Sequence, residues 1–167
     1  MTVEEFQELN GSLEATPDAL RRLVAEVDEA ALARKPSADE FSMLEHVCHL
    51  RDIEREAYAV RIEKLLGEPQ PFLPDIDGSA LAAVRRYNTQ RLVDALDDFA
   101  AARSANLRIL KTLAVEQLSR AGTQEKVGRI TLEDLILKMR EHDREHLETL
   151  DELRRRLSPS SGYKETS

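Results

Sequence analysis

The stretch that decides the fold is TLEDLILKMREHDREHLETLDELRRRL, residues 131–157 of a chain of 167 residues. Apolar residues and two histidines recur in it every three or four positions, which is the period of an amphipathic α-helix. Thr131 and Asp134 at its start form a pattern that is typical of a helix N-cap. A lone amphipathic helix is only marginally stable in water, so this helix must pack on others. Its buried stripe is expected to consist of Leu132, Leu135, Met139, His142, His146, Leu150, Leu153 and Leu157.

The N-terminal part of the chain is expected to be helical as well. The sequence Thr16-Pro17-Asp18 is typical of a helix start, with a capping residue, a first-turn proline and an acidic residue. Apolar residues at helical spacing follow it as far as a stop at Lys35-Pro36. Residues 3–15 are expected to form a helix too, although Gly11 weakens that pattern.

Two more helical regions occupy the middle of the chain. Ser42 and Glu45 form a capping box, and the helix that it opens is expected to end at Gly67. The next region covers residues 79–118, and a break is expected near Tyr87-Asn88, where Asn88 could cap a new helix.

The segments between these helices are expected to be loops, at residues 67–78 and 122–128. No segment has the pattern of a strand. The sequence therefore predicts an all-α protein, a four-helix bundle that forms a single domain over residues 1–157. Residues 158–167 are expected to be a disordered C-terminal tail.

The composition narrows the classes of function. Charged residues make up 34% of the chain and aromatic residues 4%, which disfavours a β-sandwich and suits a helical protein. The net charge of −8 argues against binding to nucleic acid. The single cysteine, Cys48, allows no internal disulfide and is interpreted as a small buried apolar residue. No secretory signal or membrane span is visible, so the expected location is the cytoplasm.

The four histidines fall in two of the predicted helices. His142 and His146 are four residues apart within an apolar stripe, so both rings lie on one buried face, where each needs a partner. His49 lies on the inward side of the second helix. Three histidines from two helices could hold a metal ion with open coordination positions, which is typical of a catalytic site. The alternative is a bundle without metal whose histidines only pack, and His46 is interpreted as a neighbour of the site or a surface residue.

Two carboxylates follow His49 on the same predicted helix. Asp52 and Glu56 could each orient a ligand histidine or accept a proton from a metal-bound water. The alternative is that both are solvated charges that pair with Arg51, Arg55 or another nearby arginine.

Two segments resemble the DinB-like superfamily. FSMLEHVCHLRD, residues 41–52, is similar to the family's second helix, which opens with an aromatic-serine pair and carries a ligand histidine just before a leucine. GRITL at residues 128–132 and HDREH at residues 142–146 look like the family's Gly-x-x-Thr helix start and its His-x-x-x-His pair. The resemblance covers about residues 10–157, and Phe41 stands where the family often has tryptophan.

The resemblance implies a bundle, often a homodimer, that holds a divalent metal on His49, His142 and His146, with nickel or zinc as the usual metal. It implies a small-molecule substrate and one of two chemistries. One is metal-dependent hydrolysis, and the other is transfer with a low-molecular-weight thiol such as mycothiol or bacillithiol. In such an enzyme Asp52 or Glu56 is expected to assist, either as the catalytic base or by orienting a ligand histidine. The alternative is a non-catalytic dimeric bundle with a stress-response or binding role.

Overall fold

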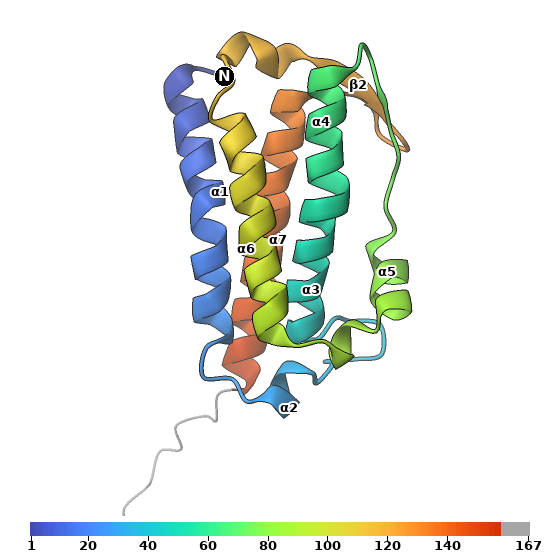
Figure 1. Ribbon diagram of the computed structural model, residues 1–167. Coiled ribbons are helices and arrows are strands. Elements are labelled where there is room, and N and C mark those ends of the chain that lie inside the picture. The colour runs from blue at the N-terminus through green and yellow to red at the C-terminus, as the bar shows by residue number, and fades with distance from the viewer. Residues whose placement is uncertain (158–167) are drawn as a thin grey trace, which may run out of the picture.

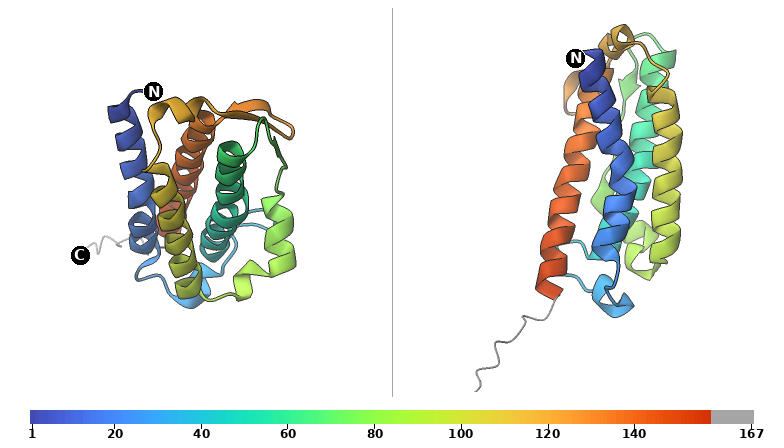
Figure 2. Two further views of the ribbon diagram at one scale, coloured as in Figure 1. Left: turned by 45° about the horizontal axis from the view of Figure 1, so that its top comes forward. Right: turned by 90° about the vertical axis from the view of Figure 1, so that its left-hand side faces the viewer.

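The computed structural model describes residues 1–157, which form a bundle of four long helices (Figures 1 and 2). The prediction of an all-α four-helix bundle is confirmed, while the predicted tail, residues 158–167, lies outside the described residues. Within residues 1–157, no helix is long and apolar enough to cross a membrane. The long elements are α1 (Val3–Val24), α3 (Met43–Ile53) continued by the π-helix η1 (Glu54–Tyr58) and α4 (Ala59–Gly67), α6 (Leu92–Leu110) and α7 (Leu132–Leu157).

The helix that begins at Met43 is capped as predicted. The Ser42 hydroxyl accepts a hydrogen bond from the Glu45 amide at 3.1 Å, and the Glu45 carboxylate accepts one from the Ser42 amide at 2.8 Å. The helix runs to Gly67, as expected, but η1 interrupts it with one wider turn. Such π-turns inside α-helices are rare and occur frequently at functional sites.

The N-terminal helix corrects one prediction, because Pro17 lies inside α1 and Thr16 is not its cap. Proline has no N–H, so it leaves the carbonyl of Leu13, four residues earlier, without its helical partner. That carbonyl accepts a hydrogen bond from Arg103 Nη1 at 2.9 Å instead. The proline is therefore tolerated because an arginine of α6 replaces the missing donor.

The ends of two predicted helices also differ from expectation. α1 ends at Val24 rather than at Lys35-Pro36, since Glu26 adopts a left-handed backbone with φ of 65° and only the short α2 (Glu29–Leu32) follows. The region over residues 79–118 does break near its middle. It consists of α5 (Gly78–Arg85), the 3₁₀-helix η2 (Tyr87–Thr89), α6 and the 3₁₀-helix η3 (Val115–Ser119), and Asn88 caps none of them.

Three short strands show that the expectation of a protein without strands is wrong. β1 (Phe72–Leu73) pairs in parallel with β2 (Ala121–Gln124), which pairs in antiparallel fashion with β3 (Gly128–Thr131). Strands of two to four residues are too short to show the alternation that identifies a strand in a sequence. This sheet lies at one end of the bundle, where Figure 1 labels β2.

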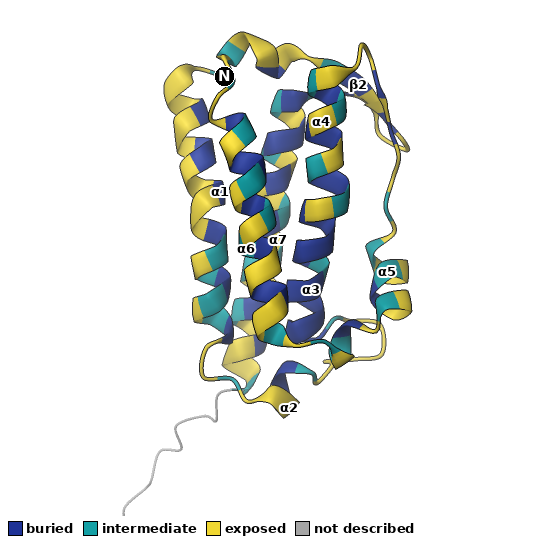
Figure 3. Ribbon diagram, viewed as in Figure 1, coloured by how far each residue is buried: buried dark blue, intermediate teal, exposed yellow. Residues whose placement is uncertain are grey.

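The core fills the bundle from end to end, and the buried faces of the long helices point inward (Figure 3). It forms two apolar clusters, one containing Leu9 and Met139 and the other containing Leu20 and Leu150. Along α1, η1, α6 and α7 a layer of buried polar side chains separates the two clusters. This polar layer consists of Thr16, Glu54, Arg103, Asn106 and Asp143, and it lies at the same level of α7 as the paired histidines.

Candidate metal centre

Two long helices, α3 and α7, bring all four histidines of the chain into one cluster. His46 and His49 come from α3, and His142 and His146 come from α7. The centroids of contacting rings are 4.5 to 5.3 Å apart. One ring nitrogen each of His49, His142 and His146 lies within 4.8 Å of the other two. The structure thus brings together the three residues that were predicted to be ligands.

The spacing of one pair of these nitrogens fits a metal ion. The Nε2 atoms of His49 and His142 face one another at 3.2 Å. Two nitrogens that bind one zinc ion at about 2.0–2.1 Å in tetrahedral geometry lie about 3.3 Å apart. The Nδ1 atoms of the same two rings are buried and have no hydrogen-bond partner among the described residues. A set of imidazole donors suits zinc and nickel.

The histidines are in the protonation state that metal binding requires. Burial lowers the pKa of His46 and of His49 from 6.5 to about 4, because a charged imidazolium loses its hydration there. Burial also lowers the pKa of His142 and His146, and for His146 the neighbouring histidines add to the effect. All four rings are therefore neutral near pH 7 and keep a lone pair for a metal ion.

His46 is a buried neighbour of the site and not a surface residue, since its relative exposure is 9%. Its Nδ1 lies 2.7 Å from Nδ1 of His146. Phe41, just before α3, packs against both histidines of that helix, with its ring centroid 5.6 Å from that of His46 and 5.5 Å from that of His49.

A glycine that sequence reasoning missed fixes the position of His49. A Cβ added at Gly78 would lie 2.3 Å from Cε1 and 2.7 Å from Nδ1 of His49, so the ring packs directly on the glycine backbone. Gly78 is the first residue of α5, after the capping residue Asp77. The glycine and the cap indicate a loop ending in a helix, but nothing in the sequence indicates that this helix start covers a histidine.

Gly78→Ala is expected to weaken metal binding without removing a ligand. The new methyl group must displace the His49 ring, and changes to groups that orient a ligand typically cost about 10–100-fold in metal affinity. Alanine is a better helix former than glycine, so α5 itself should not be weakened. Competition titration against a chromophoric chelator measures the affinity, with Ser79→Ala as the control. An affinity equal to that of the unaltered protein would contradict the prediction.

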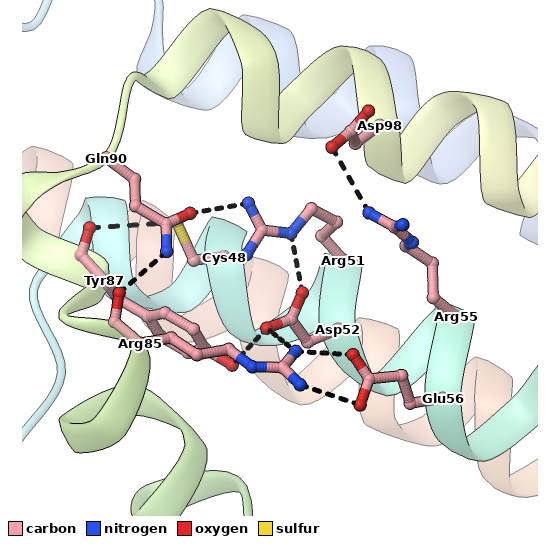
Figure 4. Close-up of polar contacts among 9 residues, drawn as sticks. All are labelled: Cys48, Arg51, Asp52, Arg55, Glu56, Arg85, Tyr87, Gln90 and Asp98. Atoms are coloured by element: carbon pink, nitrogen blue, oxygen red, sulfur yellow. Dashed lines mark hydrogen bonds and ion pairs between the residues drawn. The ribbon is translucent and has the colours of Figure 1, made fainter.

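Asp52 and Glu56 lie in a network of ion pairs and hydrogen bonds with Arg51, Arg85 and Tyr87 (Figure 4). Arg51 Nε donates to Asp52 Oδ1 at 2.7 Å, and Arg85 Nη1 and the Tyr87 hydroxyl donate to Oδ2 at 2.6 and 2.8 Å. Arg85 also binds both oxygens of Glu56, at 2.5 and 3.0 Å.

Burial alone would raise the pKa of Asp52, but the hydrogen bonds from Arg51, Arg85 and Tyr87 together lower it below its usual value. Asp52 is therefore a weak base in this arrangement. Its predicted role in catalysis, like that of Glu56, stays a prediction.

The network around Asp52 also contains Cys48, which is buried, as expected. Its Sγ lies 3.9 Å from the carbonyl oxygen of Tyr87 and 3.7 Å from Oε1 of Gln90. Burial raises the pKa of this thiol to about 11, so it is not a thiolate near pH 7.

Arg103 forms the centre of the polar layer, and its partners were not predicted from the sequence. Its guanidinium donates two hydrogen bonds of 2.9 Å to Glu54 and two of 2.6 and 3.0 Å to Asp143. Thr16 donates to Asp143 at 2.8 Å, and Asn106 donates to Glu54 at 2.8 Å. Asp143 is thus bound to α1 and α6 by Thr16 and Arg103, and it is not part of the histidine cluster.

A cavity of about 300 Å³ opens beside the histidine cluster. Phe41 and His46 form the part of its wall that contacts the other histidines. Larger hollows of about 530 and 550 Å³ lie elsewhere on the bundle and contain no histidine. The lining of the cavity near the cluster is completed by Pro36, Asp39, Glu40, Ser79, Thr149 and Leu153.

Comparisons with known proteins identify a family and a similar fold. Residues 12–150 match the DinB superfamily. No similar protein was found among curated proteins. Among solved structures the chain is similar to YfiT from Bacillus subtilis, described as "a probable metal-dependent hydrolase with an unusual four-helix bundle topology". The TM-score is 0.87 at 22% sequence identity, over 93% of this chain and 89% of that chain, so the likeness to YfiT is one of fold. With the family match covering most of its length, the chain belongs to the DinB superfamily.

Proposed function

We propose that this protein is a divalent-metal-dependent enzyme whose centre is held by His49, His142 and His146. The observation that carries the proposal is the pair of facing Nε2 atoms of His49 and His142, 3.2 Å apart, with His146 in the same group. Membership of the DinB superfamily and the similarity to YfiT support it. Nickel or zinc is the proposed metal, since imidazole donors suit both.

The residues around the centre support chemistry at an open coordination position. A bound divalent metal would lower the pKa of a coordinated water or thiol, so that a nucleophile is available near neutral pH. Three histidines leave room for that group and for a small-molecule substrate. The cavity beside Phe41 and His46 is the proposed route by which the substrate reaches the centre.

The two proposed reactions differ in the nucleophile. A water makes the protein a hydrolase, and a low-molecular-weight thiol makes it a transferase. The description of YfiT as a probable metal-dependent hydrolase favours hydrolysis as the first reaction to test. Asp52 and Glu56 are the proposed bases, and Arg85, which binds both carboxylates, would have to release one of them to free it for proton transfer.

The first test is the metal content of protein purified without a histidine tag. We expect about one divalent ion per chain after loading with Zn²⁺ or Ni²⁺, measured by elemental analysis, together with a higher melting temperature than that of the metal-free form. Absence of bound metal, with an unchanged melting temperature, would refute the proposed function and favour a non-catalytic bundle.

The second test separates the two reactions. The loaded protein and its metal-free form are compared on a panel of esters and amides, and then on electrophiles supplied with mycothiol or bacillithiol. Metal-dependent turnover without thiol indicates a hydrolase, and turnover only with thiol indicates a transferase. The homodimer, the cytoplasmic location and the absence of nucleic-acid partners stay predictions, of which the first is measured by light scattering.

A further inference from the structure

The fourth histidine, His46, lies outside the proposed ligand group but contacts one of its members. It comes one turn before His49 on α3 and is buried, at 9% relative exposure. Its Nδ1 lies 2.7 Å from Nδ1 of His146, which is hydrogen-bond distance. The group whose ring nitrogens all lie within 4.8 Å of one another contains His49, His142 and His146 but not His46.

This contact distinguishes His146 from the other two proposed ligands. The Nδ1 atoms of His49 and His142 are buried without a hydrogen-bond partner among the described residues. For His146, Nδ1 is held by His46, which leaves Nε2 as the nitrogen free to bind a metal. Metal-binding histidines commonly donate their second nitrogen to a partner that fixes the orientation of the ring.

The position of the proton follows from the chemistry of neutral imidazole, in which one nitrogen donates and the other accepts. If His46 donated to His146, the proton of His146 would be on Nε2 and neither of its nitrogens could bind a metal. If His146 donates from Nδ1 to Nδ1 of His46, its Nε2 keeps the lone pair. Only the second arrangement is compatible with His146 as a ligand.

We propose that His46 is a positioning residue of the metal centre, which accepts a hydrogen bond from His146 Nδ1 and so selects the tautomer and ring orientation that His146 needs. The inference rests on the proposed function for the metal itself. It assigns a role to a residue outside the three-histidine set and to the face of α3 that borders the cavity.

Two substitutions at position 46 separate this role from packing. In His46→Asn the amide oxygen can take the place of Nδ1 as the acceptor. In His46→Phe the ring shape is kept and the acceptor is lost. Thr149→Ala is the control, because Thr149 lines the same cavity and its hydroxyl donates to the backbone carbonyl of Glu145.

The first measurement is the affinity for Zn²⁺ and Co²⁺, by competition with a chromophoric chelator. We expect His46→Phe to bind about 10–100-fold more weakly, and His46→Asn and Thr149→Ala to bind nearly as tightly as the unaltered protein. Equal affinity of all the proteins would overturn the inference. The inference would also be overturned if X-ray absorption spectra showed one nitrogen donor fewer around Co²⁺ in His46→Phe than in the unaltered protein, since His46 would then itself be a ligand.

The second measurement needs no metal. Long-range ¹H–¹⁵N NMR spectra of the metal-free protein report which nitrogen of His146 carries the proton. We expect the Nδ1–H form in the unaltered protein and in His46→Asn, and a mixture of both forms in His46→Phe. An Nε2–H form in the unaltered protein would overturn the inference even if metal binds, whereas failure of the unaltered protein to bind metal would refute the proposed function instead.

Discussion

Replacing Arg103 with alanine is expected to lower the free energy of unfolding by about 3–5 kcal/mol, which is the usual effect of removing one partner from a buried ion pair. The side chain of Arg103 is 1% exposed, and so is that of Glu54. Removal of the guanidinium would leave Glu54 and Asp143 as two buried negative charges without a counterion. A buried charge that loses its partner is far more costly than an exposed one.

The backbone of α1 would also lose a partner. All five N–H groups of Arg103 are used, four by the two carboxylates and one by the carbonyl of Leu13. Because Pro17 cannot donate to that carbonyl, the alanine variant leaves it unpaired in the core. The expected loss of unfolding free energy therefore includes the cost of this unpaired carbonyl in α1, in addition to the cost of the two unpaired carboxylates.

Chemical denaturation monitored by circular dichroism measures this effect. Arg55→Ala is the matched control, because Arg55 forms an exposed ion pair with Asp98 and its loss should cost only about 0–1 kcal/mol. If Arg103→Ala does not fold, Arg103→Lys keeps the charge without the planar fork and should give a smaller loss. A change below that of Arg55→Ala would contradict the prediction.

The sequence was informative about the long helices and the proposed ligands, because both are local patterns. Helical period and capping residues lie within a few positions of each other, and His142 and His146 share a face for the same reason. The polar layer could not be predicted in this way. The partners of Arg103 lie in three other helices, and the pairing of a buried charge is a property of the packed bundle.

The same argument explains one wrong prediction and one missed residue. Thr16-Pro17 is typical of a helix start. The helix continues through it because Arg103 donates a hydrogen bond to the Leu13 carbonyl, which Pro17 leaves without a helical partner. Gly78 is a residue typical of the end of a loop. The reason that it must lack a side chain is the His49 ring packed against it, and the sequence does not show that contact. In both cases a distant residue determines what the local pattern means.

The polar layer and the metal centre also share a helix. Asp143 follows His142 directly in α7, and its contacts with Arg103 and Thr16 fix the rotation of that helix. With Asp143 held towards α1 and α6, His142 and His146 face α3. The buried ion pair therefore supports the geometry of the histidines through the orientation of α7.

His142→Ala is expected to have the largest effect on metal binding, because it removes one of the three proposed ligands. Loss of supporting groups around a metal typically costs about 10–100-fold in affinity, and loss of a ligand should cost more. At a free metal concentration of about 100 times its dissociation constant, the unaltered protein should gain about 2.7 kcal/mol of unfolding free energy. The variant should gain almost none under the same conditions.

The unfolding free energy of each protein is measured with and without metal, and the difference is compared between proteins. The effect of the missing ring on stability is present in both measurements and cancels in the difference. This matters because His142 Nδ1 is buried without a described partner, and its removal alone changes the metal-free stability. Thr149→Ala, on the same helix, should keep the full metal-dependent gain. If His142→Ala were stabilised by Zn²⁺ or Ni²⁺ as much as the unaltered protein, His142 would not be a ligand, and the metal would bind at another place on the chain.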